Sequence, residues 1–229
     1  MSSERLQQGY VAVLPGIEGA SLFNSNVAAG LLDAENEMAV EVHDWTTGFF
    51  PAFLVHLQHH SRNREQAEIL AEKIIAYQDE HPGRPVYLIG HSGGAGMAIL
   101  TLEALPADRQ VDGVILLAGA ISRDYDLSGA LSKTRRGIWN FYSPGDWFLL
   151  MAGTTLFGTI DRVYAPSAGA LGFRIPDNLD EAAARQYAKL HEVPYRFNMM
   201  RSGNLGGHFG PTTRRFARDY LAPIVSELE

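Results

Sequence analysis

The sequence predicts one α/β domain with a mainly parallel sheet of about six strands and helices on both faces. The chain has 229 residues, which is enough for one large domain, and its 46% hydrophobic content is ordinary for a globular protein. Short apolar runs alternate along it with segments of helical periodicity. Because parallel strands need long crossover connections, usually helices, this alternation favours a parallel sheet. No repeat or linker divides the chain, so we expect a single domain over residues 1–229.

The strands are predicted from short runs rich in Val, Ile, Leu and aromatic residues. The run Val114–Ala118 is continuously apolar, which is typical of a strand buried on both faces, so we expect it near the centre of the sheet. The predicted strands are Tyr10–Leu14, Met38–Val42, Pro85–Ile89, Gly113–Ala118 and Gly137–Tyr142, with a sixth at Tyr195–Met200.

Helices are predicted between these strands from apolar residues at helical spacing. One begins at the capping-box sequence Asn63-Arg64-Glu65-Gln66 and ends at His81-Pro82-Gly83. The others are expected over Gly94–Leu105, Leu179–Leu190 and Thr212–Leu228. The segment 147–176 is the least regular part, which is typical either of a lid or pocket wall or of a loop packed on the core.

Composition and charge exclude several classes of function. The formal net charge is −7 without a cluster of Lys and Arg, which argues against binding to nucleic acid or anionic membranes. The absence of cysteine excludes disulfides, thiolate nucleophiles and thiolate-bound zinc. The first residues lack a signal sequence, and the longest apolar stretch, 147–160, is too short to span a bilayer. We therefore expect a cytoplasmic protein without a stable membrane span.

The sequence Gly90-His91-Ser92-Gly93-Gly94 matches the pattern G-x-S-x-G and lies between a predicted strand and a predicted helix. A serine on such a sharp turn takes a strained backbone conformation, so small neighbours are needed on both sides. The following helix presents its positive end to negative charge that develops on a substrate oxygen. The alternative interpretation is an ordinary tight connection, or a phosphate cradle, in which Ser92 is a helix cap.

The segment from Tyr87 to Ala95 resembles the nucleophile elbow of α/β-hydrolases such as lipases and esterases. In that family the acid and the base follow the serine in that order, each on a loop after a later strand. The resemblance covers most of the chain through about four short segments. The family's first two strands have no counterpart before Tyr10, and the connection from Ala118 to Gly137 is short. We therefore expect a minimal form of the fold that lacks a large cap.

An imidazole must activate the serine, and only two histidines follow it. His191 lies in a predicted helix, whereas His208 lies in a glycine-rich loop that resembles the place of the family's histidine. Asp146 follows a strand through a Pro-Gly turn and resembles the family's acid loop. The alternatives are a surface-loop histidine and a turn aspartate, and Asp124 and then Asp161 are the other candidate acids.

Two backbone N–H groups are expected to stabilise the oxyanion. The resemblance implies Gly93 as the first donor and Ile17, in the loop after the first strand, as the second. Pro15 stands where the family often has histidine, so Glu18 stays an alternative to Ile17. The candidate substrate-binding residues are Trp45, Phe49 and Trp147, for which a core position is the other interpretation.

The resemblance implies a serine hydrolase that cleaves a carboxylic ester or thioester with an apolar acyl group through an acyl-Ser92 intermediate. We expect no organic cofactor and no metal, since the histidines His56, His59 and His60 lack a carboxylate at ligand spacing. The expected partner is a small-molecule ester or acyl substrate, and the oligomeric state is left open. The alternatives are an acyltransferase with the same triad and a catalytically silent binding protein of the same fold.

Overall fold

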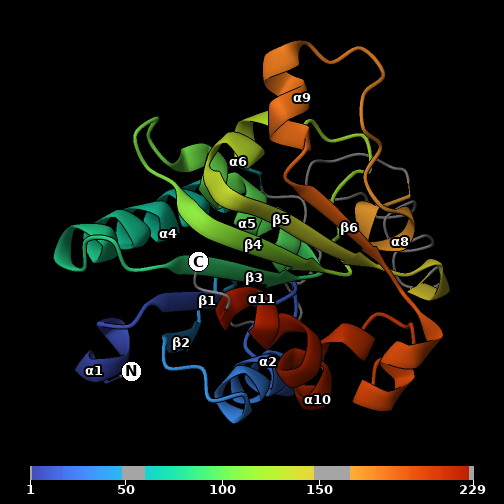
Figure 1. Cartoon of the computed structure of the whole chain (residues 1–229), viewed down its shortest axis with the longest axis horizontal. Coiled ribbons are helices and arrows are strands. Elements are labelled where there is room, and N and C mark those ends of the chain that lie inside the picture. The colour runs from blue at the N-terminus through green and yellow to red at the C-terminus, as the bar shows by residue number, and fades with distance from the viewer. Residues whose placement is uncertain (1, 48–59, 147–165, 227–229) are drawn as a thin grey trace.

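The structure is a computed structural model that describes residues 2–47, 60–146 and 166–226. Its centre is one sheet of six strands in the order β2-β1-β3-β4-β5-β6, and every neighbouring pair is parallel (Figure 1). Helices cover both faces of this sheet (Figure 1). The predicted α/β class and its mainly parallel sheet are therefore confirmed.

The first five predicted strands are present, with ends shifted by a few residues. Every residue of β1 is buried, and β4 lies inside the sheet between β3 and β5, as its apolar sequence predicts. The strands are β1 Tyr10–Leu14, β2 Ala39–Val42, β3 Val86–His91, β4 Val111–Leu117, β5 Thr134–Tyr142 and β6 Leu190–Pro194.

The predicted sixth strand was wrong in position, and the helix predicted before it over Leu179–Leu190 is present but shorter. The helix is α9, Glu181–Tyr187, and the strand β6 starts at Leu190, whereas the predicted strand region holds the 3₁₀ helix η4, Phe197–Ser202. The reason is pairing with β5, because the backbone N–H of Ile138 already donates to the carbonyl of Lys189 at 3.0 Å. His191 therefore lies on a strand and not in a helix.

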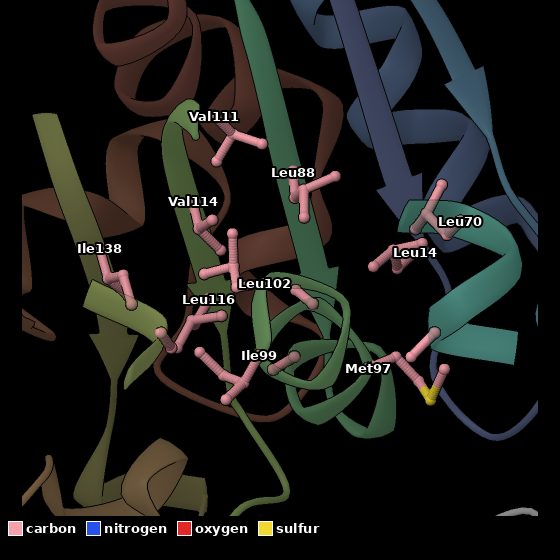
Figure 2. Close-up of a cluster of buried hydrophobic side chains, with 14 of the residues drawn as sticks. Leu14, Leu70, Leu88, Met97, Ile99, Leu102, Val111, Val114, Leu116 and Ile138 are labelled. Atoms are coloured by element: carbon pink, nitrogen blue, oxygen red, sulfur yellow. The ribbon is translucent and has the colours of Figure 1, made fainter. Parts of the chain in front are cut away.

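One face of the sheet is covered by α4, α5, α6 and α9, and the apolar side chains between them form the larger core cluster (Figures 1 and 2). Leu88 and Leu116 point from the strands toward Ile99 and Leu102 of α5 (Figure 2). Asn63 is buried inside α4, so the predicted capping box does not start that helix. The other three helices span His60–Glu80 for α4, Gly93–Ala104 for α5 and Ser128–Ser132 for α6.

The opposite face is covered by α2 (Leu22–Asp33) and the C-terminal segments (Figure 1). The helix predicted over Thr212–Leu228 is present as one continuous helical stretch from Arg214 to Ser226, which contains a π-helical turn. Gly30 of α2 lies against the backbone of Arg214, where any side chain would overlap it. The C-terminal segments are η5 Gly210–Thr212, α10 Arg214–Phe216, η6 Ala217–Leu221 and α11 Ala222–Ser226. Two further short helices are α1 Ser3–Leu6 and α8 Ala168–Leu171.

The strand order reverses between β1 and β3, and such a reversal is where a ligand-binding site can form. The helix after β1, α2, packs on one face of the sheet, whereas the helix after β3, α5, packs on the other. The two connections therefore diverge at the carboxyl ends of adjacent strands, where ligands bind in open α/β sheets. In the described ranges, no helix has the length and apolar character needed to cross a membrane.

Candidate active site

Ser92 occupies the turn between β3 and α5 with a strained backbone. Its φ is 54° and its ψ is −117°, a region that residues with a side chain seldom adopt. Its N–H donates to the carbonyl of Leu117 on β4 at 2.9 Å, and its carbonyl accepts from the N–H of Ala120 at 3.0 Å. The neighbouring strand and the loop after it therefore hold this conformation in place.

The glycines on both sides of Ser92 are required by close backbone approach. A Cβ at Gly90 would overlap the carbonyl oxygen of Gly94, because the turn folds back on itself. A Cβ at Gly94 would overlap the carbonyl oxygens of Leu14 and Pro15, because α5 starts directly against the end of β1. These glycines let the elbow form at the point where the strand order reverses.

Replacing Gly94 by alanine is expected to lower the free energy of unfolding by about 3 kcal/mol, since the added methyl group overlaps backbone that cannot rotate away. Urea denaturation followed by circular dichroism measures this change. Gly129 is the matched control because it also lies in a helix and a Cβ there has nothing within 4 Å. Gly129→Ala is expected to stabilise the protein by about 1 kcal/mol. Equal effects of the two substitutions would contradict the described packing of α5 on β1.

Asp146 and His208 are joined by a short hydrogen bond. Asp146 is the last residue of η2 (Pro144–Asp146), directly after β5, and is buried. The Nδ1 of His208 lies 2.7 Å from its Oδ2. Burial raises the pKa of Asp146 above its ordinary value, and the hydrogen bond and charge of His208 oppose this shift. The contact fixes the imidazole with Nδ1 toward the carboxylate and leaves Nε2 for another partner.

The loops that carry Asp146 and His208 are tied together by polar contacts of their own. The hydroxyl of Ser143 donates to the carbonyl of Gly206 at 2.6 Å. The side-chain oxygen of Asn204 accepts from the N–H of the same glycine at 2.9 Å. The pairing of acid and imidazole is therefore supported by backbone contacts as well as by the side chains.

His91 connects the elbow to the loop of the imidazole, a contact that the sequence does not predict. Its Nε2 lies 3.1 Å from the carbonyl oxygen of His208, and because a carbonyl only accepts, this nitrogen carries the proton. The two rings are 4.8 Å apart between centroids. Burial, with a smaller contribution from the nearby His208, lowers the pKa of His91 to about 3. Since the x position of G-x-S-x-G is variable, no motif indicates this residue.

The buried, neutral His91 is expected to make stability depend on pH. It titrates near 6.5 when exposed in the unfolded chain and near 3 when folded, so between these values the unfolded state binds one more proton. Stability should therefore fall as pH falls through this window, by up to about 1.4 kcal/mol per pH unit from this group. Urea denaturation at several pH values measures the slope of the unfolding free energy against pH. His91→Phe should reduce this slope by the amount that corresponds to about one bound proton. The same slope in the wild type and in His91→Phe would show that the His91 ring binds its proton as readily in the folded state as in the unfolded state.

The predicted triad residues are not all in contact. No hydrogen bond joins the Ser92 hydroxyl to the His208 imidazole within the described part of the chain. His91 links the two residues. It directly precedes Ser92 in the sequence, and its ring Nε2 contacts the backbone carbonyl of His208. Asp124, the alternative acid, instead forms an exposed ion pair with Arg174 at 2.9 Å. Asp161 lies outside the described residues.

The two predicted oxyanion donors lie near each other. Gly93 is the first residue of α5, where backbone N–H groups have no acceptor within the helix. A Cβ atom added to Gly93 would lie 3.6 Å from the backbone nitrogen of Ile17. The Glu18 side chain folds back over Gly16 and brings Oε1 to 3.9 Å from Nδ1 of His91. Ile17 stays the predicted second donor, with the backbone N–H of Glu18 as the alternative.

Of the predicted substrate-binding residues, the structure describes Trp45, and Phe49 and Trp147 lie outside the described residues. Trp45 is fully buried in the core, which agrees with the core interpretation of its ring. Its Nε1 donates to the carbonyl of Pro15 at 2.8 Å and supports the loop after β1. Of the irregular segment 147–176, the structure describes only residues 166–176, which include α8.

Several solved structures are similar in fold to this chain. One is a dienelactone hydrolase-like promiscuous phosphotriesterase from metagenomic libraries, which is 12% identical with a TM-score of 0.55 over 96% of this chain and 86% of that one. The chain has the α/β-hydrolase fold. No protein-family model and no curated protein sequence matches it.

Two other structures give weaker similarity to this α/β-hydrolase fold. A CIB-like hydrolase from Thermoplasma acidophilum is 18% identical with a TM-score of 0.46, over 100% of this chain and 89% of that one. A lipase-esterase related protein from Clostridium acetobutylicum is 12% identical with a TM-score of 0.47, over 97% and 95%. At these identities the likeness concerns the fold, and the chemistry has to be argued from the side chains.

The form of the α/β-hydrolase fold is compact in the described part. The connection from β4 to β5 contains only the five-residue helix α6, so no cap domain is inserted there. Ser92 follows β3, Asp146 follows β5 and His208 follows β6. The expected order of serine, acid and histidine at the carboxyl ends of the strands is thus present in space as well as in sequence.

Proposed function

We propose that this α/β-hydrolase is a serine hydrolase that cleaves carboxylic esters or thioesters with an apolar acyl group. Ser92 is the nucleophile, His208 the general base and Asp146 the residue that orients the imidazole. The 2.7 Å contact between the buried Asp146 and His208 is the observation that carries the proposal. A buried carboxylate bound to Nδ1 selects the tautomer whose Nε2 can accept a proton.

In the first half of the reaction, the Ser92 oxygen attacks the carbonyl carbon of the substrate while Nε2 of His208 accepts the hydroxyl proton. The tetrahedral intermediate then collapses, the bond to the leaving group breaks, and His208 gives the proton to the departing oxygen or sulfur. Asp146 stays ionised and stabilises the imidazolium that forms in between. The product of this step is acyl-Ser92 and a free alcohol or thiol.

In the second half, a water molecule attacks the acyl group while His208 accepts a proton from it. The carboxylic acid is released and the Ser92 hydroxyl is restored. The N–H groups of Gly93 and Ile17 stabilise the negative oxygen in both halves, a contribution typically worth about 3 kcal/mol per donor. The missing Ser92–His208 hydrogen bond agrees with this role, because such contacts often tighten only when substrate is bound.

The apolar acyl preference is supported by the sequence directly after Asp146, Trp147-Phe148-Leu149-Leu150. Nitrophenyl esters of increasing chain length, assayed beside the matching thioesters, test this part of the proposal. The kcat/KM is expected to rise with chain length and then level off.

A fluorophosphonate probe tests the central claim. We expect one probe per chain, and peptide mass spectrometry should place the adduct on Ser92. An intact protein that is not labelled near neutral pH would favour the silent binding protein instead. If the probe labels Ser92, unlabelled enzyme that forms more ester than acid when an alcohol is added would favour the acyltransferase.

A further inference from the structure

Phe23 and Phe209 form an exposed aromatic pair beside the proposed base. Their rings are stacked with centroids 4.1 Å apart and planes 19° apart. Phe23 is 37% exposed and Phe209 is 38% exposed, so each keeps more than a third of its surface open to water, unlike the aromatic residues of the core. The pair therefore presents apolar area to water at a place where a ligand could cover it.

The position of this pair follows from its contacts with the imidazole. Phe209 is the residue after His208, and its ring meets the His208 ring edge-on at 5.1 Å. It also lies 5.6 Å from the ring of His91. Phe23 comes from the first turn of α2, the helix that follows the loop with the proposed donor Ile17. Two separate parts of the chain thus contribute to one apolar surface next to the base.

The proposed reaction determines which part of the substrate this surface contacts. Because Nδ1 of His208 is bound to Asp146, the proton passes through Nε2 to the oxygen or sulfur of the leaving group. The atoms attached to that oxygen must therefore lie beside the imidazole during proton transfer. A surface that adjoins the imidazole ring contacts the alcohol or thiol part of the substrate more readily than the acyl part.

We propose that Phe23 and Phe209 bind the leaving group and favour substrates with a flat, apolar alcohol or thiol, such as a phenyl or naphthyl group. This inference rests on the proposed function and adds the class of leaving group to it. An aromatic leaving group would lie against the exposed pair and cover the apolar area. The leaving group leaves with acylation, so the surface acts in that half of the reaction alone.

A purely structural role accounts less well for Phe23. The buried residues of α2 are Asn24, Val27, Gly30 and Leu31, whereas Phe23, in the first turn of the helix, is 37% exposed. Removing its ring is therefore expected to leave the packing of α2 in place. This makes Phe23 a suitable position for a test that does not depend on a change in folding.

The test compares two acetates, 2-naphthyl acetate and ethyl acetate, which differ only in the leaving group. The ratio of their kcat/KM values is measured for the wild type, Phe23→Ala and Phe209→Leu. We expect Phe23→Ala to lower the preference for naphthyl acetate about tenfold, with a smaller change in the same direction for Phe209→Leu. Leu32→Ala is the control, because Leu32 is a 44% exposed apolar residue at the other end of α2. Its ratio should stay at the wild-type value.

Four outcomes would overturn the inference. An equal loss for both acetates would show that the pair acts through the position of His208. A change that depends on acyl length in nitrophenyl esters, and not on the leaving group, would assign the pair to the acyl side. A wild type that is neither labelled by fluorophosphonate nor active on any ester would overturn the proposed function together with this inference. Labelling of Ser92 without a shift in the ratio would overturn the inference alone.

Discussion

Replacing Ser92 by alanine is expected to lower kcat for ester hydrolysis by about 10⁶-fold, the loss typical when a triad nucleophile is removed. The remaining triad members cannot replace it, since the imidazole then has no hydroxyl to activate. The residual rate comes from the oxyanion donors and from substrate binding. Initial rates with a nitrophenyl ester, with hydrolysis by buffer subtracted, measure the effect.

The matched control is Ser25→Ala, which removes an exposed hydroxyl that donates to the carbonyl of Ser21, the N-cap residue of α2. It should keep wild-type kcat and wild-type labelling by fluorophosphonate. Equal unfolding midpoints for the two variants would show that the fold is intact in both. A Ser92→Ala protein with more than a few per cent of wild-type turnover would contradict the role of this residue.

Replacing Asp146 by asparagine should lower kcat by about 10⁴-fold at neutral pH, the scale of loss seen when a triad carboxylate becomes an amide. Asparagine has nearly the same shape, but its amide can donate a hydrogen bond to Nδ1 of His208. That contact favours the tautomer with the proton on Nε2, which cannot accept the hydroxyl proton of Ser92. The kcat over a range of pH, measured with the same ester, checks the prediction.

Asp124→Asn is the control for that experiment, because it tests the other candidate acid by the same chemical change. Asp124 is exposed and paired with Arg174, so its substitution should change kcat less than about twofold and stability by less than about 1 kcal/mol. A large loss for Asp124→Asn together with a small one for Asp146→Asn would assign the acid to the loop after β4.

The parts of the fold that were predicted correctly are those in which local sequence and burial agree. The strand at Tyr10–Leu14 and the run Val114–Leu117 of β4 are continuously apolar because both of their faces are covered by helices. The start of β6 was missed because it depends on pairing between Lys189 and Ile138, a contact far apart in sequence. Its residues are only half-buried and include His191 and Glu192, so no apolar run marks the strand.

In the candidate site, too, the residues marked by local sequence were predicted, and the contacts between distant parts of the chain were not. A motif with fixed spacing indicates Ser92, and the loop order indicates Asp146 and His208. The contact of His91 with the His208 carbonyl and the stacking of Phe23 on Phe209 each join residues that lie far apart in the sequence. No local pattern encodes such pairs, since they arise only when α2 and the C-terminal segments pack on the same face of the sheet.

The backbone of Ser92 is held from outside by Leu117 and Ala120, and this has a consequence for how the protein loses activity. A residue at φ 54° relaxes to an ordinary conformation once its anchors separate, with a gain of about 1–3 kcal/mol. Leu117 ends β4 in the middle of the sheet and Ala120 lies in the buried loop directly after it, a core region that we expect to open only in global unfolding. Heat inactivation should therefore be all-or-none, without a population of folded molecules that have a misaligned serine.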